Sequence, residues 1–98
     1  MSTTTTGSRA DGAPHELSER VRHDLVAFLE QRTKSPVAVD VDLFAAGLVS
    51  SLFALELVVH LESTFGVAVA GPELTLDNFR TVEAMAALVV RLSGPAGG

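Results

Sequence analysis

The 98-residue sequence contains no cysteine, no tryptophan and no tyrosine, and five phenylalanines are its only aromatic residues. The absence of cysteine excludes disulfide bonds, thiolate metal sites and a cysteine nucleophile. Long apolar runs are also missing: a run such as 84–90 is far shorter than the roughly 20 residues that a membrane helix needs. The N-terminus is rich in threonine and lacks the basic-then-apolar pattern of a signal peptide. We therefore expect a cytoplasmic protein that does not bind a membrane.

The length allows one domain with a modest core, and an apolar fraction of 47% is sufficient for a globular fold. Residues 1–14 and 93–98 are rich in threonine, glycine, serine and proline and have no apolar periodicity, so both segments are predicted to be disordered tails. Residues 15–92 remain to build a single domain, which we expect to be a monomer.

The net charge of −5 is unevenly distributed. Residues 40–83 hold seven acidic residues and one basic residue. Such a field repels nucleic acid and favours basic protein partners, although a solvated acidic surface that only keeps the domain soluble is the alternative. Asp40 and Asp42 lack the glycine and the distal glutamate of a calcium loop, so we expect no metal site.

Three segments have the apolar periodicity of an α-helix. They are 15–33 (stripe Leu17, Val21, Leu25, Phe28, Leu29), 51–65 (stripe Ala54, Leu57, Val58, Leu61, Phe65) and 82–92 (stripe Val82, Met85, Leu88, Val89, Leu92). Gly66 suits a helix C-terminus and Thr81 an N-cap, while Pro72 and the segment 74–79 indicate a short helical turn. The prediction is an all-α fold, a small four-helix bundle with three main helices and a short third one.

The first connection, residues 35–49, is long and contains many apolar residues. The alternation in residues 37–41 is compatible with a short strand, but no second strand is available to pair with it. We therefore predict an extended loop that is held to the core by Leu43 and Phe44.

The helix predicted over 51–65 has a second apolar face, formed by Leu52, Leu55 and Val59 and flanked by Glu56 and Glu62. Either both faces are buried, which is difficult in so small a domain, or this second face is a docking patch. We favour docking.

A serine pair, Ser50 and Ser51, stands where this helix begins, and a helix N-terminus favours an anion. One alternative is that the serines only cap the helix, which serine does well. An enzyme is disfavoured because His60 follows Ser51 by nine residues, which separates them by about 13.5 Å along the helix axis. The histidines also lack a metal-ligand spacing, so we predict no catalytic residue.

Residues 42–66, with the sequence DLFAAGLVSSLFALELVVHLESTFG, resemble the acyl carrier protein family. The pair Ser51-Leu52 and the later Glu56-Leu57-Val58, Leu61-Glu62 and Phe65 match the family pattern in register. Ser50 stands where the family usually has aspartate, which leaves two adjacent hydroxyls as candidates.

The resemblance implies that the chain is a carrier and not an enzyme, with 4′-phosphopantetheine attached covalently to Ser51, and to Ser50 as the less favoured choice. A phosphopantetheinyl transferase would attach it from coenzyme A. Acyl-loading and tailoring enzymes would then dock on Leu52, Leu55, Glu56, Val59 and Glu62.

At a finer level, the segment 76–82 and the serine pair are similar to discrete carriers of unusual polyketide extender units of the methoxymalonyl or hydroxymalonyl type. That similarity implies an antibiotic pathway with a polyketide synthase acyltransferase as partner. Two alternatives stay open: an aminoacyl carrier of the D-alanyl or peptidyl type, and a helical interaction module without a prosthetic group.

Overall fold

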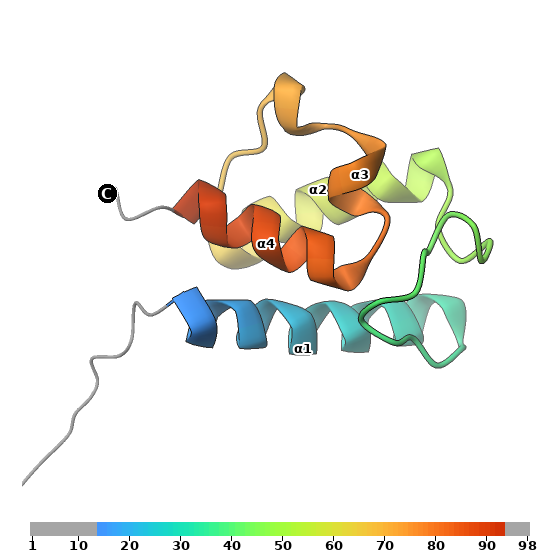
Figure 1. The fold of residues 1–98 in the computed structure, drawn as a ribbon. Coiled ribbons are helices and arrows are strands. Elements are labelled where there is room, and N and C mark those ends of the chain that lie inside the picture. Colours follow the sequence, from blue (N-terminus) through green and yellow to red (C-terminus); the bar gives the residue numbers. More distant parts are fainter. Residues whose placement is uncertain (1–13, 94–98) are drawn as a thin grey trace, which may run out of the picture.

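The computed structural model describes residues 14–93, which form one small helical bundle (Figure 1). In chain order the elements are α1 (Pro14–Thr33), α2 (Ser51–Phe65), the 3-10 turn η2 (Gly71–Glu73), α3 (Leu76–Phe79) and α4 (Val82–Ser93). No strand occurs in this range. The predicted all-α bundle, with three main helices and one short helix, is confirmed.

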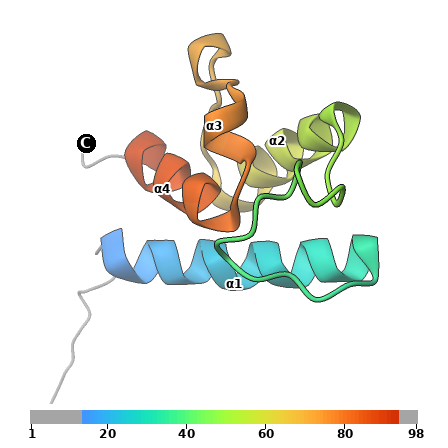
Figure 2. The same cartoon turned by 45° about the vertical axis from the view of Figure 1, so that its right-hand side comes forward.

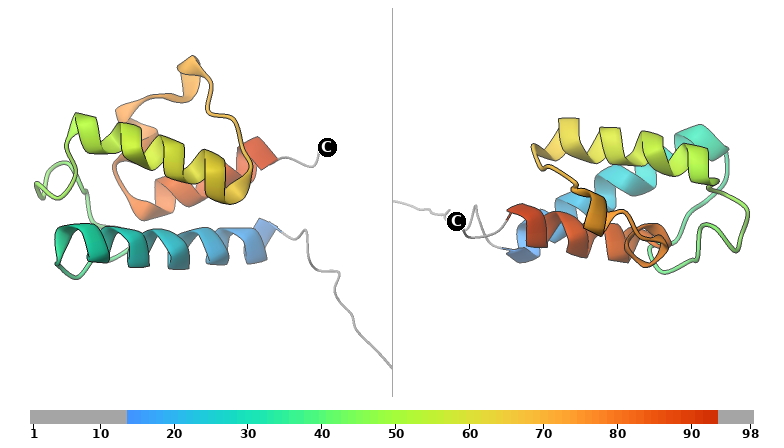
Figure 3. Two further views of the ribbon diagram at one scale, coloured as in Figure 1. Left: turned by 180° about the vertical axis from the view of Figure 1, so that it is seen from behind. Right: turned by 90° about the horizontal axis from the view of Figure 1, so that it is seen from above.

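Helix α1 lies beneath the other two long helices. Seen from above, α2 lies on one side of the bundle and α4 on the other, and α1 passes obliquely below both (Figure 3). The chain therefore closes the bundle with its first and last helices in contact. The short helix α3 stands on α4 and connects it to the η2 segment (Figure 2).

The core is formed by the predicted apolar stripes together with the first loop. In α1 the stripe residues Val21, Leu25 and Leu29 are fully buried, whereas Leu17 and Phe28 are half-buried. The remaining buried residues are Val37, Leu43, Val49, Leu57, Leu61, Val67, Phe79, Val82, Met85, Ala86, Leu88 and Val89. Three helices thus share one core, since no pair of them could cover all of these side chains alone.

The helix ends follow from local chemistry. Gly66 ends α2 at φ 69°, a left-handed conformation that favours glycine, and its N–H donates to Glu62 O at 3.0 Å. Thr81 precedes α4, and its hydroxyl accepts the N–H of Ala84 at 2.9 Å, as an N-cap does. Both predicted termini are confirmed.

The first loop folds back along α1 before it rises to α2 (Figure 2). Val37 and Leu43 are buried, and Phe44 is half-buried. The N–H of Leu43 donates to Arg80 O at 2.7 Å, and Val39 O accepts the N–H of Glu83 at 3.0 Å. These contacts confirm an extended loop held to the core, and they tie it to the junction of α3 and α4.

The apolar residues of the η2 and α3 segments differ in burial. Phe79 is buried, whereas Leu74 and Leu76 are 47% and 53% exposed. Helix α1 begins at Pro14 and α4 ends at Ser93, two residues that the sequence predicts to lie in the tails. The predicted disordered tails otherwise fall on residues 1–13 and 94–98, which lie outside the described range.

Residues 14–93 lack two kinds of feature. None of the helices in this range has the length and apolar character needed to cross a membrane. Nor does the range contain a group of three or more histidine, aspartate or glutamate side chains that is placed to hold a metal ion.

Candidate functional site at the start of helix α2

The two adjacent serines have different roles in the structure. Ser50 is the N-cap of α2, with extended backbone angles of φ −100° and ψ 172°. Its hydroxyl accepts the N–H of Phe53 at 3.2 Å, and its carbonyl accepts the N–H of Ala54 at 2.9 Å. The Ser50 hydroxyl is therefore engaged in holding the first turn of the helix.

Ser51 is the first residue of α2, and its side chain is exposed. Within the described residues its hydroxyl makes no hydrogen bond. The N–H groups of Ser51 and Leu52 lie in the first turn and have no acceptor within the helix. Because these groups and the helix dipole favour an anion, the environment suits a phosphate ester on Ser51.

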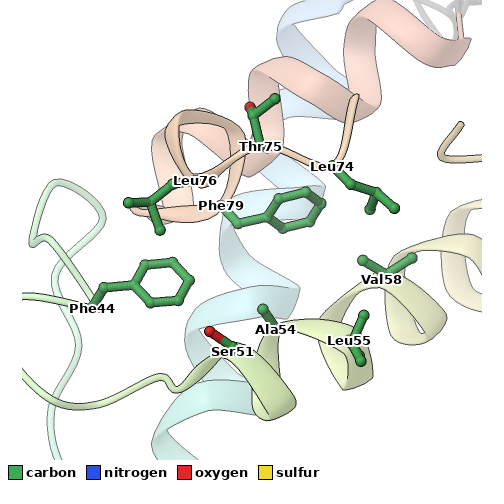
Figure 4. A pocket seen from close by; sticks show the side chains of 9 residues that line it. All are labelled: Phe44, Ser51, Ala54, Leu55, Val58, Leu74, Thr75, Leu76 and Phe79. Atoms are coloured by element: carbon green, nitrogen blue, oxygen red, sulfur yellow. The ribbon is translucent and has the colours of Figure 1, made fainter. Parts of the chain in front are cut away.

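An apolar groove of about 290 Å³ lies beside Ser51, between α2 and the segment that contains η2 and α3 (Figure 4). It is lined by Phe44, Ser51, Ala54, Leu55, Val58, Leu74, Thr75, Leu76 and Phe79. Figure 4 shows the Ser51 hydroxyl at the end of the groove where Phe44 lies, with Leu76 and Phe79 across from α2. A flexible, largely uncharged chain attached at Ser51 has room to lie here. The residues present thus fit the group that the family resemblance implies.

The predicted docking face of α2 is open to solvent. Leu52, Leu55 and Val59 are 72%, 57% and 63% exposed, so the alternative in which both faces of α2 are buried is wrong. Three neighbouring aliphatic side chains at this exposure are typical of a surface that another protein covers. That Leu52, Leu55 and Val59 serve as a docking patch remains a prediction.

The two glutamates that flank this face are not free carboxylates. Glu56 forms an ion pair with Arg32 of α1. Glu62 accepts the backbone N–H of Val69 at 2.8 Å and so holds the segment that follows α2. The sequence reasoning missed both contacts, because their partners come from other parts of the chain and no local pattern marks them.

The histidine nearest to the serine pair in the sequence faces α1. His60 Nε2 lies 2.5 Å from Asp24 Oδ2, and the His60 ring stacks on Phe28 with a centroid distance of 4.1 Å. His60 is therefore engaged in packing α2 on α1, and it is directed away from the Ser51 hydroxyl. The structure brings no histidine to Ser51.

Arg80 is a residue of this region whose role sequence reasoning missed. Its guanidinium lies 3.6 Å from Asp42 in the first loop and 3.3 Å from Asp77 in α3. Asp42 in turn accepts the N–H groups of Phe44 and Ala45 at 3.1 and 3.0 Å. This network positions Phe44 at one wall of the groove.

Comparison with known proteins bears directly on this site. The model of a family described as a phosphopantetheine attachment site matches residues 20–89. The D-alanyl carrier proteins of Streptococcus pyogenes serotype M5 (strain Manfredo) and serotype M1 are each 49% identical to this chain over 43 residues. The matched stretch is 44% of this chain and 54% of each relative, so the chain spans about half the length of the curated relatives it matches.

Proposed function

Because this chain belongs to the family with a phosphopantetheine attachment site, we propose that it is an aminoacyl carrier with its arm on Ser51. The prosthetic group of the family is a covalently attached 4′-phosphopantetheine. When attached, it supplies a terminal thiol that holds a carboxylic acid as a thioester. Carriers of this family act as substrates of partner enzymes and not as enzymes themselves.

The assignment to Ser51 rests on one observation above the others. Of the two adjacent hydroxyls, that of Ser50 accepts a hydrogen bond in the N-cap, whereas that of Ser51 is exposed and makes none within residues 14–93. In the modification the Ser51 oxygen attacks the phosphorus of coenzyme A that bears the pantetheine arm, and a new phosphorus–oxygen bond forms. The bond between that phosphorus and the bridging oxygen of the pyrophosphate breaks, and adenosine 3′,5′-bisphosphate leaves with the bridging oxygen. The hydroxyl proton passes to a base of the transferase, since residues 14–93 place no base at the site.

For the cargo we favour an aminoacyl group, because the relatives named above are D-alanyl carrier proteins. These relatives give no support to a polyketide extender unit or to a polyketide synthase acyltransferase as partner. Residues of the segment 76–82, on which the polyketide interpretation was based, also have structural roles in the fold. Asn78 donates to Glu73 O at 2.8 Å, Arg80 pairs with Asp42 and Asp77, and Thr81 caps α4. We therefore place the extender-unit carrier second.

The attachment site is tested by incubating the purified chain with a broad-specificity phosphopantetheinyl transferase, Mg²⁺ and coenzyme A, followed by intact-protein mass spectrometry. We expect one phosphopantetheine increment on the unmodified sequence and on Ser50→Ala, and none on Ser51→Ala. The Ser50→Ala variant is the matched control, because it removes the neighbouring hydroxyl and leaves the target. Absence of an increment on the unmodified sequence would refute the carrier function.

The cargo is tested on the phosphopantetheinylated protein with two loading systems. A D-alanine-activating ligase with ATP and D-alanine should add one alanyl group, whereas an acyltransferase with malonyl coenzyme A should leave the mass unchanged. The alanyl group should be released by hydroxylamine, as a thioester is. Loading by the acyltransferase alone would instead establish the extender-unit carrier.

A further inference from the structure

The chain has few side chains that can attack an activated acyl group. It contains no cysteine and a single lysine, Lys34, and its other positively charged side chains are arginines, which stay protonated in proteins. Serine and threonine hydroxyls need a base to react. His60 is paired with Asp24 and stacked on Phe28. Lys34 thus supplies the one side-chain amine of the sequence.

Lys34 lies at the end of the bundle at which Ser51 lies. Helices α1 and α2 run in opposite directions (Figures 1 and 3), and Arg32 near the end of α1 pairs with Glu56 in the second turn of α2. Lys34 follows Arg32 by two residues, about 3 Å along the axis. Ser51 precedes Glu56 by five residues, about 7.5 Å toward the same end. Lys34 and Ser51 therefore stand at nearly the same level, at the ends of neighbouring helices.

The residues next to these two in the chain border one depression of the surface. Thr33, which precedes Lys34, and Ser50, which precedes Ser51, both line a hollow that also includes Gly47 of the first loop. The surface between the two helix ends is therefore hollowed, and a flexible arm attached at Ser51 can cross it.

The backbone and the side chain of Lys34 are both unusual for a helix end. Lys34 follows the last residue of α1 at φ 60°, and its N–H donates to Glu30 O at 2.8 Å. This left-handed conformation favours glycine or asparagine, so the cap alone does not account for a lysine. The Lys34 side chain is exposed and takes part in no ion pair within residues 14–93, and the nearby Glu30 carboxylate accepts the N–H of Val37. Its amine can therefore meet a group that the arm brings to it.

We propose that Lys34 accepts the acyl group from the thioester on the arm of its own chain, so that the loaded carrier acylates itself. The proposal rests on the proposed attachment at Ser51 and on a thioester cargo. The neutral amine of Lys34 attacks the thioester carbonyl, a carbon–nitrogen bond forms, and the carbon–sulfur bond breaks. The proton that the amine loses passes through water to the departing sulfur. The products are an amide on Lys34 and a free thiol on the arm, which can be loaded again.

The tether gives this transfer an advantage over reaction between two chains. A short flexible linker holds two groups at an effective concentration in the millimolar range, so at about 10 μM protein the internal transfer should be about 100-fold faster. The two forms of the cargo also differ chemically. Hydroxylamine cleaves a thioester and leaves an amide intact, so the carried and the transferred group can be measured separately.

The experiment attaches the arm and its cargo in one step. A broad-specificity phosphopantetheinyl transferase with Mg²⁺ transfers alanyl-phosphopantetheine from D-alanyl coenzyme A to Ser51. The loaded protein is separated from coenzyme A and incubated at several dilutions, and samples are treated with hydroxylamine before intact-protein mass spectrometry. Alanyl mass that survives this treatment is bound as an amide, and peptide mapping locates it.

Two variants are the matched controls. Lys34→Arg retains the positive charge and removes the amine. Lys34→Arg/Arg20→Lys has the composition of the unmodified sequence, but its lysine lies 14 residues earlier in α1, about 21 Å farther from the level of Ser51. Arg20 is exposed and takes part in no ion pair within residues 14–93, so the exchange leaves the bundle intact. Circular dichroism checks the fold of both variants.

We expect the hydroxylamine-resistant alanyl group to form at a rate that dilution does not change. This rate should be at least about tenfold higher in the unmodified sequence than in Lys34→Arg, and at least about fivefold higher than in the exchange variant. A rate proportional to protein concentration, equal rates in the exchange variant, or resistant mass on the α-amino group in place of Lys34 would each overturn the proposal.

The same experiment separates this proposal from the carrier function. If no alanyl-phosphopantetheine is attached, the carrier function fails and self-acylation fails with it. If the arm is loaded but all alanyl mass stays labile to hydroxylamine, only self-acylation is refuted.

Discussion

Replacement of Ser50 or Ser51 by alanine removes a hydroxyl from one of two neighbouring positions, and we expect the two changes to affect different properties. The Ser50 hydroxyl accepts the N–H of Phe53 at 3.2 Å, whereas the exposed Ser51 hydroxyl makes no hydrogen bond within residues 14–93. Ser50→Ala should therefore lower the free energy of unfolding, and Ser51→Ala should leave it almost unchanged while it abolishes modification.

The magnitude follows from the cap. Loss of a serine N-cap costs about 1 kcal/mol, and in a domain of this size about 1 kcal/mol corresponds to a fall in Tm of roughly 4–8 °C. At Ser51 the change should stay within about 0.5 kcal/mol, since an exposed side chain without a partner is removed and alanine is a good helix former.

Urea unfolding of the apo-proteins, followed by far-UV circular dichroism, measures both values. Ser50→Asp is the matched control, because aspartate also accepts a first-turn N–H and should retain the stability that Ser50→Ala loses. A larger loss in Ser51→Ala than in Ser50→Ala would refute this reasoning, because it would make Ser51 the cap and leave Ser50 as the available hydroxyl.

Three further predictions concern other parts of the bundle. Leu61→Ala should lower the free energy of unfolding by about 2–5 kcal/mol in urea titrations because Leu61 is fully buried, whereas Leu52→Ala, at 72% exposed, should cost less than about 0.5 kcal/mol. Gly66→Ala should lower Tm in calorimetry, with a cost of about 1–2 kcal/mol, because Gly66 has φ 69° although a Cβ would meet no atom within 4 Å. Glu56→Gln should change stability by less than about 1 kcal/mol, because both side chains of its ion pair with Arg32 are about half exposed, and any loss should shrink as NaCl is raised in the same titration.

Much of the fold could be predicted because it follows from local patterns. The burial of Val21, Leu25 and Leu29 repeats at the helical period, and Gly66 and Thr81 carry the chemistry of helix ends. The first loop was also predictable, since it holds too many apolar residues, Leu43 and Phe44 among them, for a connection that is fully solvated. These features need only short stretches of sequence to be recognised.

The candidate site could be predicted only in part, because its charged side chains interact with residues from other segments of the sequence. Arg32 and Glu56, which form an ion pair, are 24 residues apart in the sequence. The hydrogen bond from the Val69 N–H to Glu62 depends on how the chain turns after α2. Helical periodicity alone therefore predicts only that Glu56 and Glu62 flank the apolar face, and not that each has a partner. The choice between Ser50 and Ser51 was open for a similar reason, since it depends on the residue at which the helix begins.

The contact between α1 and α4 has a consequence for the order in which the domain can fold. Helix α4 supplies Val82, Met85, Ala86, Leu88 and Val89, one third of the buried core, and it follows every other element of the described bundle in the chain. A chain that has been synthesised only as far as α3 leaves the apolar stripe of α1 uncovered, so the bundle can close only after α4 has been made. The folded form of α2 that presents Ser51 thus depends on a helix that is synthesised after it.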